Sequence, residues 1–522
     1  MAQNRFNLVD EPWIPIADTG LVNLHEIFQN PSLKALGGNP VQKIALLKLL
    51  LAICQAAYTP KNDEDWEAVG PDGLADKALE YLGKQRDCFW LYGDKPFLQM
   101  PAIVKAAKKS FGVVMPDIAT GNTTVLTQSQ KERPLSDAEK AILVVQLMGM
   151  ALAGGQTDNS IVLSLGYLGK SSDKDKEKPS PGKPGPCIGS YGYLHNFLLG
   201  TTIAETLYLN LLTEENIKQQ RIFTERLGPI PWETPPTGED DEIAKKLQYS
   251  IMGRLVPFSR FVLLTEDGIH YSEGIIYPDY QDGGMPDPSV AMNGSGKKMQ
   301  VLWTDSSKRP WRNLTSLLGF LQEGGTYFEC PYIKLGLFRG RKILPAIGIL
   351  SAGLQTSKKL KEQYVSGTDD YVESETFFES AVIDKYLYQN LKTEMSILDE
   401  LDYVLRGSIY RYYEDPKQET KTKGKPNTKK QPKDKSLAKK LNKSSELFWQ
   451  LCERRFQDLV NACGIRDGGK EAEKTRPYFL QCVRNVFETF CPRDTARQLE
   501  AWAKHYPNLS RYTAKKEEVT TD

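Results

Sequence analysis

The chain has 522 residues, of which 40% are hydrophobic and 10% aromatic, a composition typical of a folded globular protein. This length exceeds what a single hydrophobic core supports, so we expect two or three domains. The formal net charge of +1 excludes a uniformly basic coat for nucleic acid. Any contact with DNA therefore has to come from local patches.

The N-terminal segment predicts a short apolar strand that runs into a turn. Phe6 and Leu8 supply the strand. The run Pro-Trp-Ile-Pro at 12–15 is held extended, because each proline fixes its own φ and disfavours helix at the residue before it. On pattern alone, the simplest interpretation is an edge strand that caps a core.

The body that follows mixes both types of element. Apolar residues at helical spacing predict helices over 41–58 and 204–212, and a third that starts at Ser136 and stops at a Gly-Gly pair. Short β-like runs separated by turn residues then occupy 261–264, 299–303, 332–337 and 343–350. We expect residues 1–370 to form a large mixed α+β domain.

The C-terminal region, 371–522, is predicted to be helical. Candidate helices cover 374–413, 444–463, 472–490 and 493–505, which together predict a four-helix bundle. The fold class is therefore α+β, with a mixed N-terminal domain followed by a C-terminal four-helix bundle.

A lysine-rich segment, 416–443, is the predicted connection between the first two helices of the bundle. It holds eleven lysines against two acidic residues, so the rest of the chain has 56 basic and 64 acidic residues. With so few apolar residues, the segment is predicted to be disordered and to add sequence-independent affinity for DNA.

Signatures of catalysis, metal binding and membrane insertion are absent from the sequence. The four histidines lie far apart, no two of the eight cysteines form a Cys-x-x-Cys pair, and phosphate loops and nucleophile elbows are missing. The acidic run 239–242 is most simply a solvated turn. No apolar run approaches an uninterrupted membrane span and no signal peptide is evident, so we expect a cytoplasmic protein without a metal, a cofactor or a catalytic residue.

Three segments are candidates for binding nucleic acid. The polar segment 121–133 can donate to phosphates or base edges, although it could equally be an ordinary solvent loop. The segment 153–156 (Ala-Gly-Gly-Gln) follows a predicted helix, where Gly-Gly is also a normal helix stop. The third, 353–359, follows a β-like run and could equally be a basic solvated turn.

An ordered set of short motifs carries a resemblance to a known family. After the N-terminal segment come Pro-Phe-Leu-Gln at 96–99, the three segments above, Pro-Trp-Glu at 231–233, Asp-Pro-Ser-Val-Ala at 287–291 and Pro-Trp-Arg at 310–312. In this order they resemble CasA, the large subunit of the type I-E CRISPR surveillance complex Cascade, over about residues 5–505. Each motif is unspecific by itself, and the specificity lies in their order.

The resemblance implies a function in sensing the protospacer-adjacent motif (PAM) of target DNA. It implies a glycine loop in the minor groove, a loop near the PAM and the crRNA end, and a wedge that splits the first base pair. Either Lys358 or Gln355 would be the tip of the wedge. The implied residues are, for the glycine loop, Ala153, Gly154, Gly155 and Gln156; for the second loop, Asn122, Thr123, Thr124, Val125, Thr127, Gln128, Lys131 and Arg133; and for the wedge, Gln355, Thr356, Ser357 and Lys358.

The same resemblance implies the partners. They are the crRNA-containing backbone and small subunits of Cascade, double-stranded target DNA with a PAM, and a helicase-nuclease recruited after target binding. Two other classes of function stay open on the sequence: a generic nucleic-acid scaffold that acts through its lysine-rich segment, and a hydrolase with an unrecognised active site.

Overall fold

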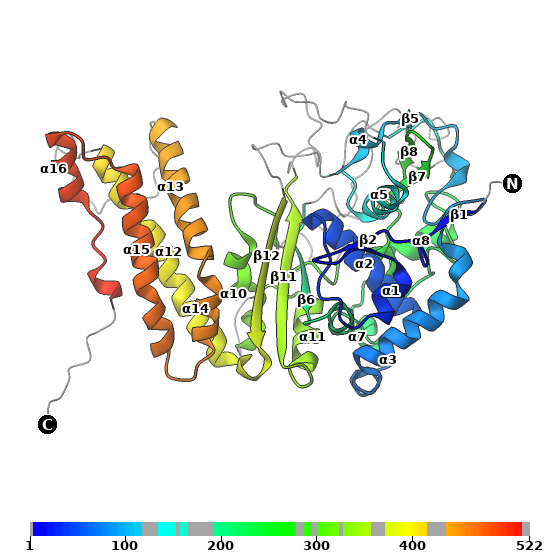
Figure 1. The fold of residues 1–522 in the computed structure, drawn as a ribbon, viewed down its shortest axis with the longest axis horizontal. Coiled ribbons are helices and arrows are strands. Elements are labelled where there is room, and N and C mark those ends of the chain that lie inside the picture. Colours follow the sequence, from blue (N-terminus) through cyan, green and yellow to red (C-terminus); the bar gives the residue numbers. More distant parts are fainter. Residues whose placement is uncertain are drawn as a thin grey trace. The chain divides into compact units, whose positions relative to one another are not determined.

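The computed structural model describes residues 4–116, 134–152, 157–164, 167, 192–277, 287–294, 300–322, 327–356, 371–414 and 435–513. The chain divides into two compact units (Figure 1). Unit 1 consists of Met1–Trp311 and Thr326–Thr376, and unit 2 of Arg312–Gly325 and Phe377–Asp522.

Unit 1 begins with small strand pairs that cover its core. Strand β1 pairs antiparallel with β4, and β2 with β3. Trp13 is fully buried, and its indole N–H donates to the main-chain oxygen of Leu8 at 3.0 Å. The prediction of an extended segment after Pro12 is confirmed. The strands are β1 (Arg5–Asn7), β2 (Ile14–Ile16), β3 (Gly20–Val22) and β4 (Trp90–Tyr92).

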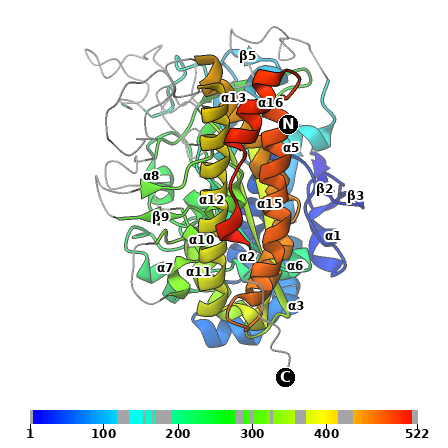
Figure 2. The same cartoon turned by 90° about the vertical axis from the view of Figure 1, so that its left-hand side faces the viewer.

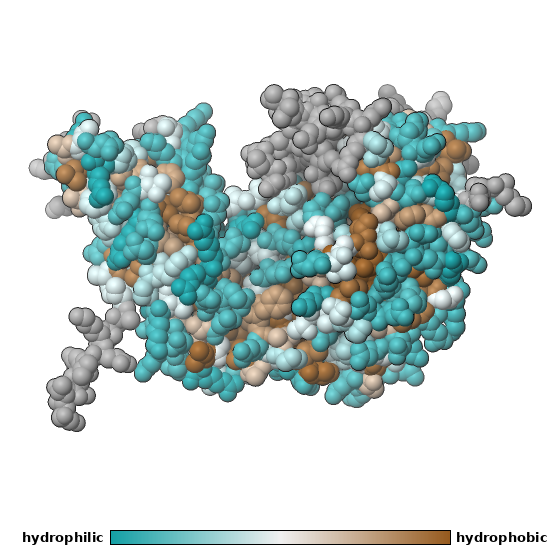
Figure 3. Space-filling model, in the orientation of Figure 1, coloured by the Kyte–Doolittle hydropathy of each residue, from teal (hydrophilic) through white to brown (hydrophobic). Residues whose placement is uncertain are grey.

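Helix α2 (Pro40–Ala57) is the central helix of unit 1. It packs against α3 (Asp63–Lys84), α5 (Asp137–Gly149) and strand β11 (Ala346–Leu354), and it is buried on nearly all sides. Among the described residues, α2 alone has the length and apolar composition that a membrane crossing needs, and 78% of its apolar window is buried inside the protein. The surface seen in Figure 3 is mostly hydrophilic, with apolar residues confined to smaller areas.

Two of the predicted helices of the body begin where expected but end early: α5 ends at Gly149, five residues before its predicted stop at Gly154. Ser136 and Glu139 form a reciprocal capping box at the start of α5, which satisfies main-chain donors that have no partner within the helix. Thr202 caps α6, which ends three residues before the predicted end. The remaining short helices of unit 1 are α1 (Leu24–Gln29), α4 (Phe111–Val114), α6 (Ile203–Leu209), α7 (Glu214–Gln219), α8 (Glu242–Gln248) and α9 (Met252–Leu255).

Two three-stranded sheets organise the rest of unit 1. In the first, the order is β5-β8-β7, so β5 is an edge strand; in the second, the order is β12-β11-β6. Both sheets are antiparallel where the register is described. The strands are β5 (Lys108–Lys109), β6 (His195–Leu199), β7 (Arg260–Leu264), β8 (Ile269–Glu273), β9 (Met292–Asn293), β10 (Gln300–Val301), β11 (Ala346–Leu354) and β12 (Tyr371–Glu379).

The prediction of a β-like run at 332–337 is wrong, because these residues belong to helix α11 (Pro331–Gly340). Pro331 occupies the first turn, where its missing N–H costs no hydrogen bond. Gly336 and Gly340 face Leu209 so closely that an added Cβ would meet it within 3.0 Å. A short apolar run does not distinguish a strand from a helix. Here the helix is favoured by the close packing against Leu209 that these two glycines permit.

Unit 2 is a set of helices in which long elements lie side by side (Figure 2). Helices α12 and α15 pack against each other, and Arg476 of α15 forms two hydrogen bonds, of 2.6 and 2.9 Å, with the buried carboxylate of Glu394 on α12. The helices are α10 (Leu314–Leu317), α12 (Lys385–Tyr413), α13 (Lys435–Glu453), α14 (Phe456–Cys463), α15 (Lys470–Phe490) and α16 (Ala496–His505).

Three predicted boundaries in unit 2 are wrong. The predicted helix 374–413 begins as strand β12, and α12 starts only after Asp384, whose carboxylate caps it. The predicted helix 444–463 is two helices, α13 and α14, which break at 454–455. Residues 435–443 are the first turns of α13 and not part of a disordered connection, because Leu437 and Leu441 bury an apolar face; 416–434 lie outside the described residues.

Candidate nucleic-acid interface

Most residues of the three predicted binding segments lie outside the described part of the chain. This holds for 122–133, for 153–156 and for Ser357 and Lys358. Gln355 and Thr356 of the third segment are described, as are the residues on both sides of 153–156. The geometry of the interface is therefore built from these flanking residues.

The N-terminal flank of 153–156 is fixed by a buried arginine. Helix α5 leads through Gly149 to Leu152, whose main-chain oxygen accepts a 3.0 Å hydrogen bond from Nη2 of Arg260 on β7. Arg260 is only 1% exposed, and its Nη1 donates to the oxygen of Ser259 at 2.6 Å. Since a buried guanidinium needs acceptors, it holds Leu152 in place.

The C-terminal flank is fixed by Asp158. Its main-chain N–H donates to Tyr271 of β8 at 2.9 Å, and its main-chain oxygen accepts from the hydroxyl of Ser272 at 3.2 Å. Its carboxylate accepts from the N–H of Ala107 at 2.7 Å and from the N–H and hydroxyl of Ser160 at 3.0 and 2.6 Å. Burial alone would raise the pKa of Asp158, but these hydrogen bonds and the nearby charge of Lys109 lower it.

Both flanks of 153–156 are thus attached to the same three-stranded sheet. Arg260 belongs to β7, Tyr271 and Ser272 belong to β8, and Ala107 directly precedes β5. In Figure 1 these strands lie together beside α5. The sequence alone does not single out Arg260 or Asp158, because each contacts a partner far away in the chain. Leu152, the partner of Arg260, is more than a hundred residues away, and Ala107, the partner of Asp158, is about fifty residues away.

The described part of the predicted wedge is anchored at the end of β11. The side-chain oxygen of Gln355 accepts from the N–H of Ser306 at 2.6 Å, and Thr356 is 8% exposed. Gly192, with φ of +69°, approaches this segment so closely that an added Cβ would lie 3.1 Å from the oxygen of Leu354. Gln355 and Thr356 are therefore both held against the body of unit 1.

A buried polar cluster includes the start of the predicted motif 287–291. Lys48 of α2 forms an ion pair with Asp287, whose carboxylate also accepts from the hydroxyl of Ser289 at 2.6 Å. Nδ1 of His195 lies 2.8 Å from that hydroxyl. Burial raises the pKa of Asp287, but the charge of Lys48 and the hydrogen bonds outweigh burial and bring it to about 2. Burial, helped by the charge of Lys48, lowers the pKa of His195 to about 3.

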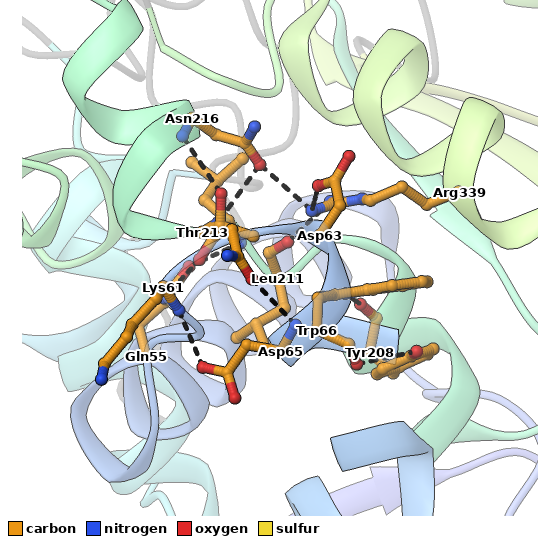
Figure 4. A network of polar contacts seen from close by, with 12 residues as sticks. Gln55, Lys61, Asp63, Asp65, Trp66, Tyr208, Leu211, Thr213, Asn216 and Arg339 are labelled. Carbon is orange, nitrogen blue, oxygen red and sulfur yellow. Dashed lines mark hydrogen bonds and ion pairs between the residues drawn. The ribbon is translucent and has the colours of Figure 1, made fainter. Parts of the chain in front are cut away.

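A second network joins four helices at another part of unit 1 (Figure 4). Arg339 of α11 is 6% exposed, and its guanidinium lies 4.6 Å from the ring centroid of Trp66 of α3. It donates to Asn216 of α7 at 3.1 Å and to the main-chain oxygen of Leu211 at 2.8 Å. Trp66 in turn stacks on Tyr208 of α6 with 4.0 Å between centroids. These contacts tie α11 to α3 and α7 and to the residues that follow α6.

The acidic run 239–242 is not simply a solvated turn. Glu239 is fully buried, and its carboxylate accepts from the N–H of Leu163 and, at 2.8 Å, from that of Ser164. Asp241 caps α8 through the N–H of Ala244 at 2.7 Å. The run is acidic because two of its carboxylates satisfy main-chain donors.

In the described ranges, no three His, Cys, Asp or Glu side chains lie together in a way that could hold a metal ion. The seven cysteines in this part of the chain are free. Burial raises the pKa of the thiols of Cys54 and Cys463, so these two groups stay protonated and inert at neutral pH. The absence of a metal and of a catalytic residue stays a prediction.

The fold and the sequence together define a CRISPR-associated protein. The model of the family described as CRISPR-associated protein Cse1 matches residues 7–488. The chain therefore belongs to the Cse1 family, the CasA large subunits, and the resemblance carried by the ordered motifs is confirmed.

Individual relatives agree with this assignment. A curated relative from Thermus thermophilus, named CRISPR-associated protein CasA/Cse1, is 27% identical over 347 residues, an alignment that spans 60% of each chain. A crystal structure of CasA from Thermus thermophilus matches with a TM-score of 0.71 and 19% identity, over 97% of this chain and 99% of that one.

Two further structures show the same fold. Cse1 from Acidimicrobium ferrooxidans has a TM-score of 0.69 and 18% identity, over 97% of both chains. A chain of a structure described as a CRISPR RNA-guided surveillance complex has a TM-score of 0.64 and 13% identity, over 96% of this chain and 98% of that one. The mixed helix and sheet fold of this chain is the fold of the CasA and Cse1 structures.

Proposed function

We propose that this chain is the non-catalytic large subunit of a type I-E Cascade, a cytoplasmic CRISPR RNA-guided surveillance complex. In this role it recognises the PAM in duplex DNA, starts unwinding of the target so that crRNA can pair with it, and helps to recruit a helicase-nuclease. Its membership of the Cse1 family and its full-length likeness to a chain of a surveillance complex support the proposal.

The observation that carries the proposed PAM contact is the attachment of both flanks of 153–156 to one sheet. A backbone that enters a minor groove has to be held at a defined position, since a misplacement of about 1 Å weakens a binding site strongly. Arg260 and Asp158 supply that hold from buried or hydrogen-bonded groups. Gly154 and Gly155 lack a Cβ, which permits close approach to the base edges.

The other two segments are assigned by their place in the chain. Residues 122–133 are proposed to contact the PAM and the crRNA end, through Asn122, Thr123, Thr124, Val125, Thr127, Gln128, Lys131 and Arg133. The wedge is proposed at 355–358. Because Gln355 is bonded to Ser306 and Thr356 is buried, we favour a tip at Lys358 with Gln355 in the base.

We further propose that the C-terminal helices form the four-helix bundle that their sequence pattern predicts. If α13 and α14 are counted as one broken helix, α12, α13–α14, α15 and α16 supply its four members. In this proposal residues 1–370 carry the PAM-sensing segments and 371–522 carry the bundle.

Co-purification tests the proposal against its alternatives. Tagged full-length protein, expressed with its neighbouring CRISPR-associated genes and a guide, is expected to bring down a crRNA with several backbone and small subunits. The purified complex is expected to bind duplex that carries a PAM more tightly than duplex that lacks one. A generic scaffold would bind duplexes with no such preference. A hydrolase would show turnover that survives repurification and disappears when an acidic pair is substituted.

A further inference from the structure

Two cysteines meet between two helices of unit 2. Cys452 lies in the last turn of α13 and Cys482 lies in the middle of α15, and these two helices pack against each other. Cys452 is fully buried, and Cys482 is 3% exposed. Both are free thiols, and their side chains are close enough for a thiol–thiol hydrogen bond. The fold therefore places two sulfur atoms from different helices in contact.

A tyrosine fixes the register of the two helices at this contact. Tyr478 lies one turn before Cys482 on α15, and its hydroxyl donates to the main-chain oxygen of Leu451 at 2.8 Å. Residues four apart share one face of a helix, so Tyr478 and Cys482 both face the end of α13. Leu451 and Tyr478 are half-buried and Arg454 is exposed, so the thiol pair lies just below the surface of unit 2.

The surroundings make the two thiols chemically different. A hydrogen bond from the thiol of Cys452 lowers the pKa of Cys482 more than burial raises it, and the hydroxyl of Tyr478 and the charge of Arg454 lower it further. Burial raises the pKa of Cys452. Within the described ranges, Cys482 is the only cysteine whose pKa is lowered. Since the thiolate is the reactive form, Cys482 is the nucleophile of the pair.

We propose that Cys452 and Cys482 form a redox-active pair, which hydrogen peroxide oxidises to a disulfide that links α13 to α15. The inference goes beyond the proposed function and does not depend on it. Disulfides in a reducing compartment are usually transient and serve redox sensing. A disulfide here would also restrain the unfolded chain and so stabilise unit 2 while the oxidant is present.

The oxidation balances with hydrogen peroxide as its one co-reactant. The thiolate of Cys482 attacks one oxygen of the peroxide, the O–O bond breaks, and the leaving hydroxide takes up the proton released by that thiol, which gives water and a sulfenic acid. The sulfur of Cys452 then attacks the sulfur of the sulfenic acid. The S–O bond breaks, and hydroxide leaves with the proton of Cys452 as a second water. Two thiols are oxidised, and one peroxide is reduced to water.

Ordinary core packing is the competing explanation for the same pair. A buried cysteine often serves only as a small apolar residue, and burial then keeps it protonated and inert. Cys463 of α14 is a matched control, because it is fully buried in the same unit and burial raises its pKa. A pair that only packs should resist peroxide as Cys463 does.

The test treats the purified full-length chain with hydrogen peroxide, as wild type and as Cys452→Ala, Cys482→Ala and the control Cys463→Ala. After the remaining thiols are blocked in denaturant, mass spectrometry of the peptides locates each disulfide and each oxidised cysteine. A reagent specific for sulfenic acids, dimedone, is present in a parallel sample. The disulfide is mapped in the wild-type chain itself, so this readout stands even where a variant fails to fold.

We expect peroxide to link Cys452 to Cys482 in the wild type and in Cys463→Ala, and a reductant to restore both thiols. Cys452→Ala should stop at a sulfenic acid on Cys482 that dimedone labels, and Cys482→Ala should leave Cys452 reduced. The linked wild type should unfold at a temperature roughly 5–10 °C higher than the reduced one. Oxidation of the pair no faster than that of Cys463, or dimedone labelling of Cys452 in place of Cys482, would overturn the inference.

Discussion

Nη2 of Arg260 lies 3.0 Å from the main-chain oxygen of Leu152, the last described residue before 153–156. A buried cation on β7 thus fixes the end of the described chain after α5. This relationship makes Arg260 a positioning residue for the proposed glycine loop.

Arg260→Met is expected to weaken binding of PAM-bearing duplex more than binding of a target that is already unpaired beside the PAM. It should also lower the free energy of unfolding by about 2–4 kcal/mol, because two hydrogen bonds from a buried charged group are lost. Urea denaturation measures the second effect and separates it from the first. Equal losses of affinity on both targets would mean that Arg260 has only a structural role.

The ion pair of Lys48 and Asp287 predicts a large effect of removing one partner. Lys48→Met should lower the free energy of unfolding by about 3–5 kcal/mol, since it leaves the carboxylate of Asp287 buried without its cation. The double variant Lys48→Met/Asp287→Asn should recover much of this loss. Denaturant titration measures the free energy of unfolding of both variants. A double variant less stable than the single one would contradict this account.

His195 predicts a loss of stability at acidic pH. Its pKa is about 3 in the folded protein and about 6.5 in an unfolded chain, so below pH 6.5 the unfolded state binds a proton that the folded state does not. Stability from this group is complete above pH 6.5 and falls by up to about 1.4 kcal/mol per pH unit toward pH 3. In His195→Gln the decline between about pH 6.5 and 4.5 should be shallower, as followed by thermal denaturation; an unchanged profile would contradict the assignment.

Two helical glycines predict effects of opposite sign for the same substitution. An added Cβ at Gly336 would fall within 3.0 Å of Leu209 and Leu198, whereas at Gly83 it would meet nothing within 4 Å. Gly336→Ala should therefore lower the free energy of unfolding by about 1–3 kcal/mol, and Gly83→Ala should raise it by up to about 1 kcal/mol. Denaturation curves of the two variants check this pair, and similar shifts in both would show that α11 does not pack as described.

The elements that the sequence predicts well are those with a local signal. The start of α5 is predicted by its cap residue Ser136, and that of α2 by its apolar positions, so both helices begin within one residue of the prediction. Helix α11 and strand β12 are missed because their residues carry mixed signals that only tertiary contacts resolve. The close approach of Gly336 to Leu209 is one such contact.

The candidate interface shows the same division. The segments 121–133, 153–156 and 353–359 stand out by composition and order, which is enough to indicate a binding surface. Arg260 and Asp158 do not stand out, because a single buried arginine in a strand or an aspartate in a turn has many structural uses. Their role is visible only when β7, β8 and the residue before β5 are brought together by the fold.

The most direct test of the central claim compares two DNA targets in the assembled complex with Gly154→Val or Gly155→Val. One target is matched PAM-bearing duplex, and the other is the same target pre-opened as a bubble at the first base pairs. An added side chain should block close approach to the minor groove, so affinity for the duplex should fall at least about tenfold, equivalent to about 1.4 kcal/mol, while affinity for the bubble stays largely intact. Equal losses on both targets, or none on either, would contradict the assignment of PAM sensing to this segment.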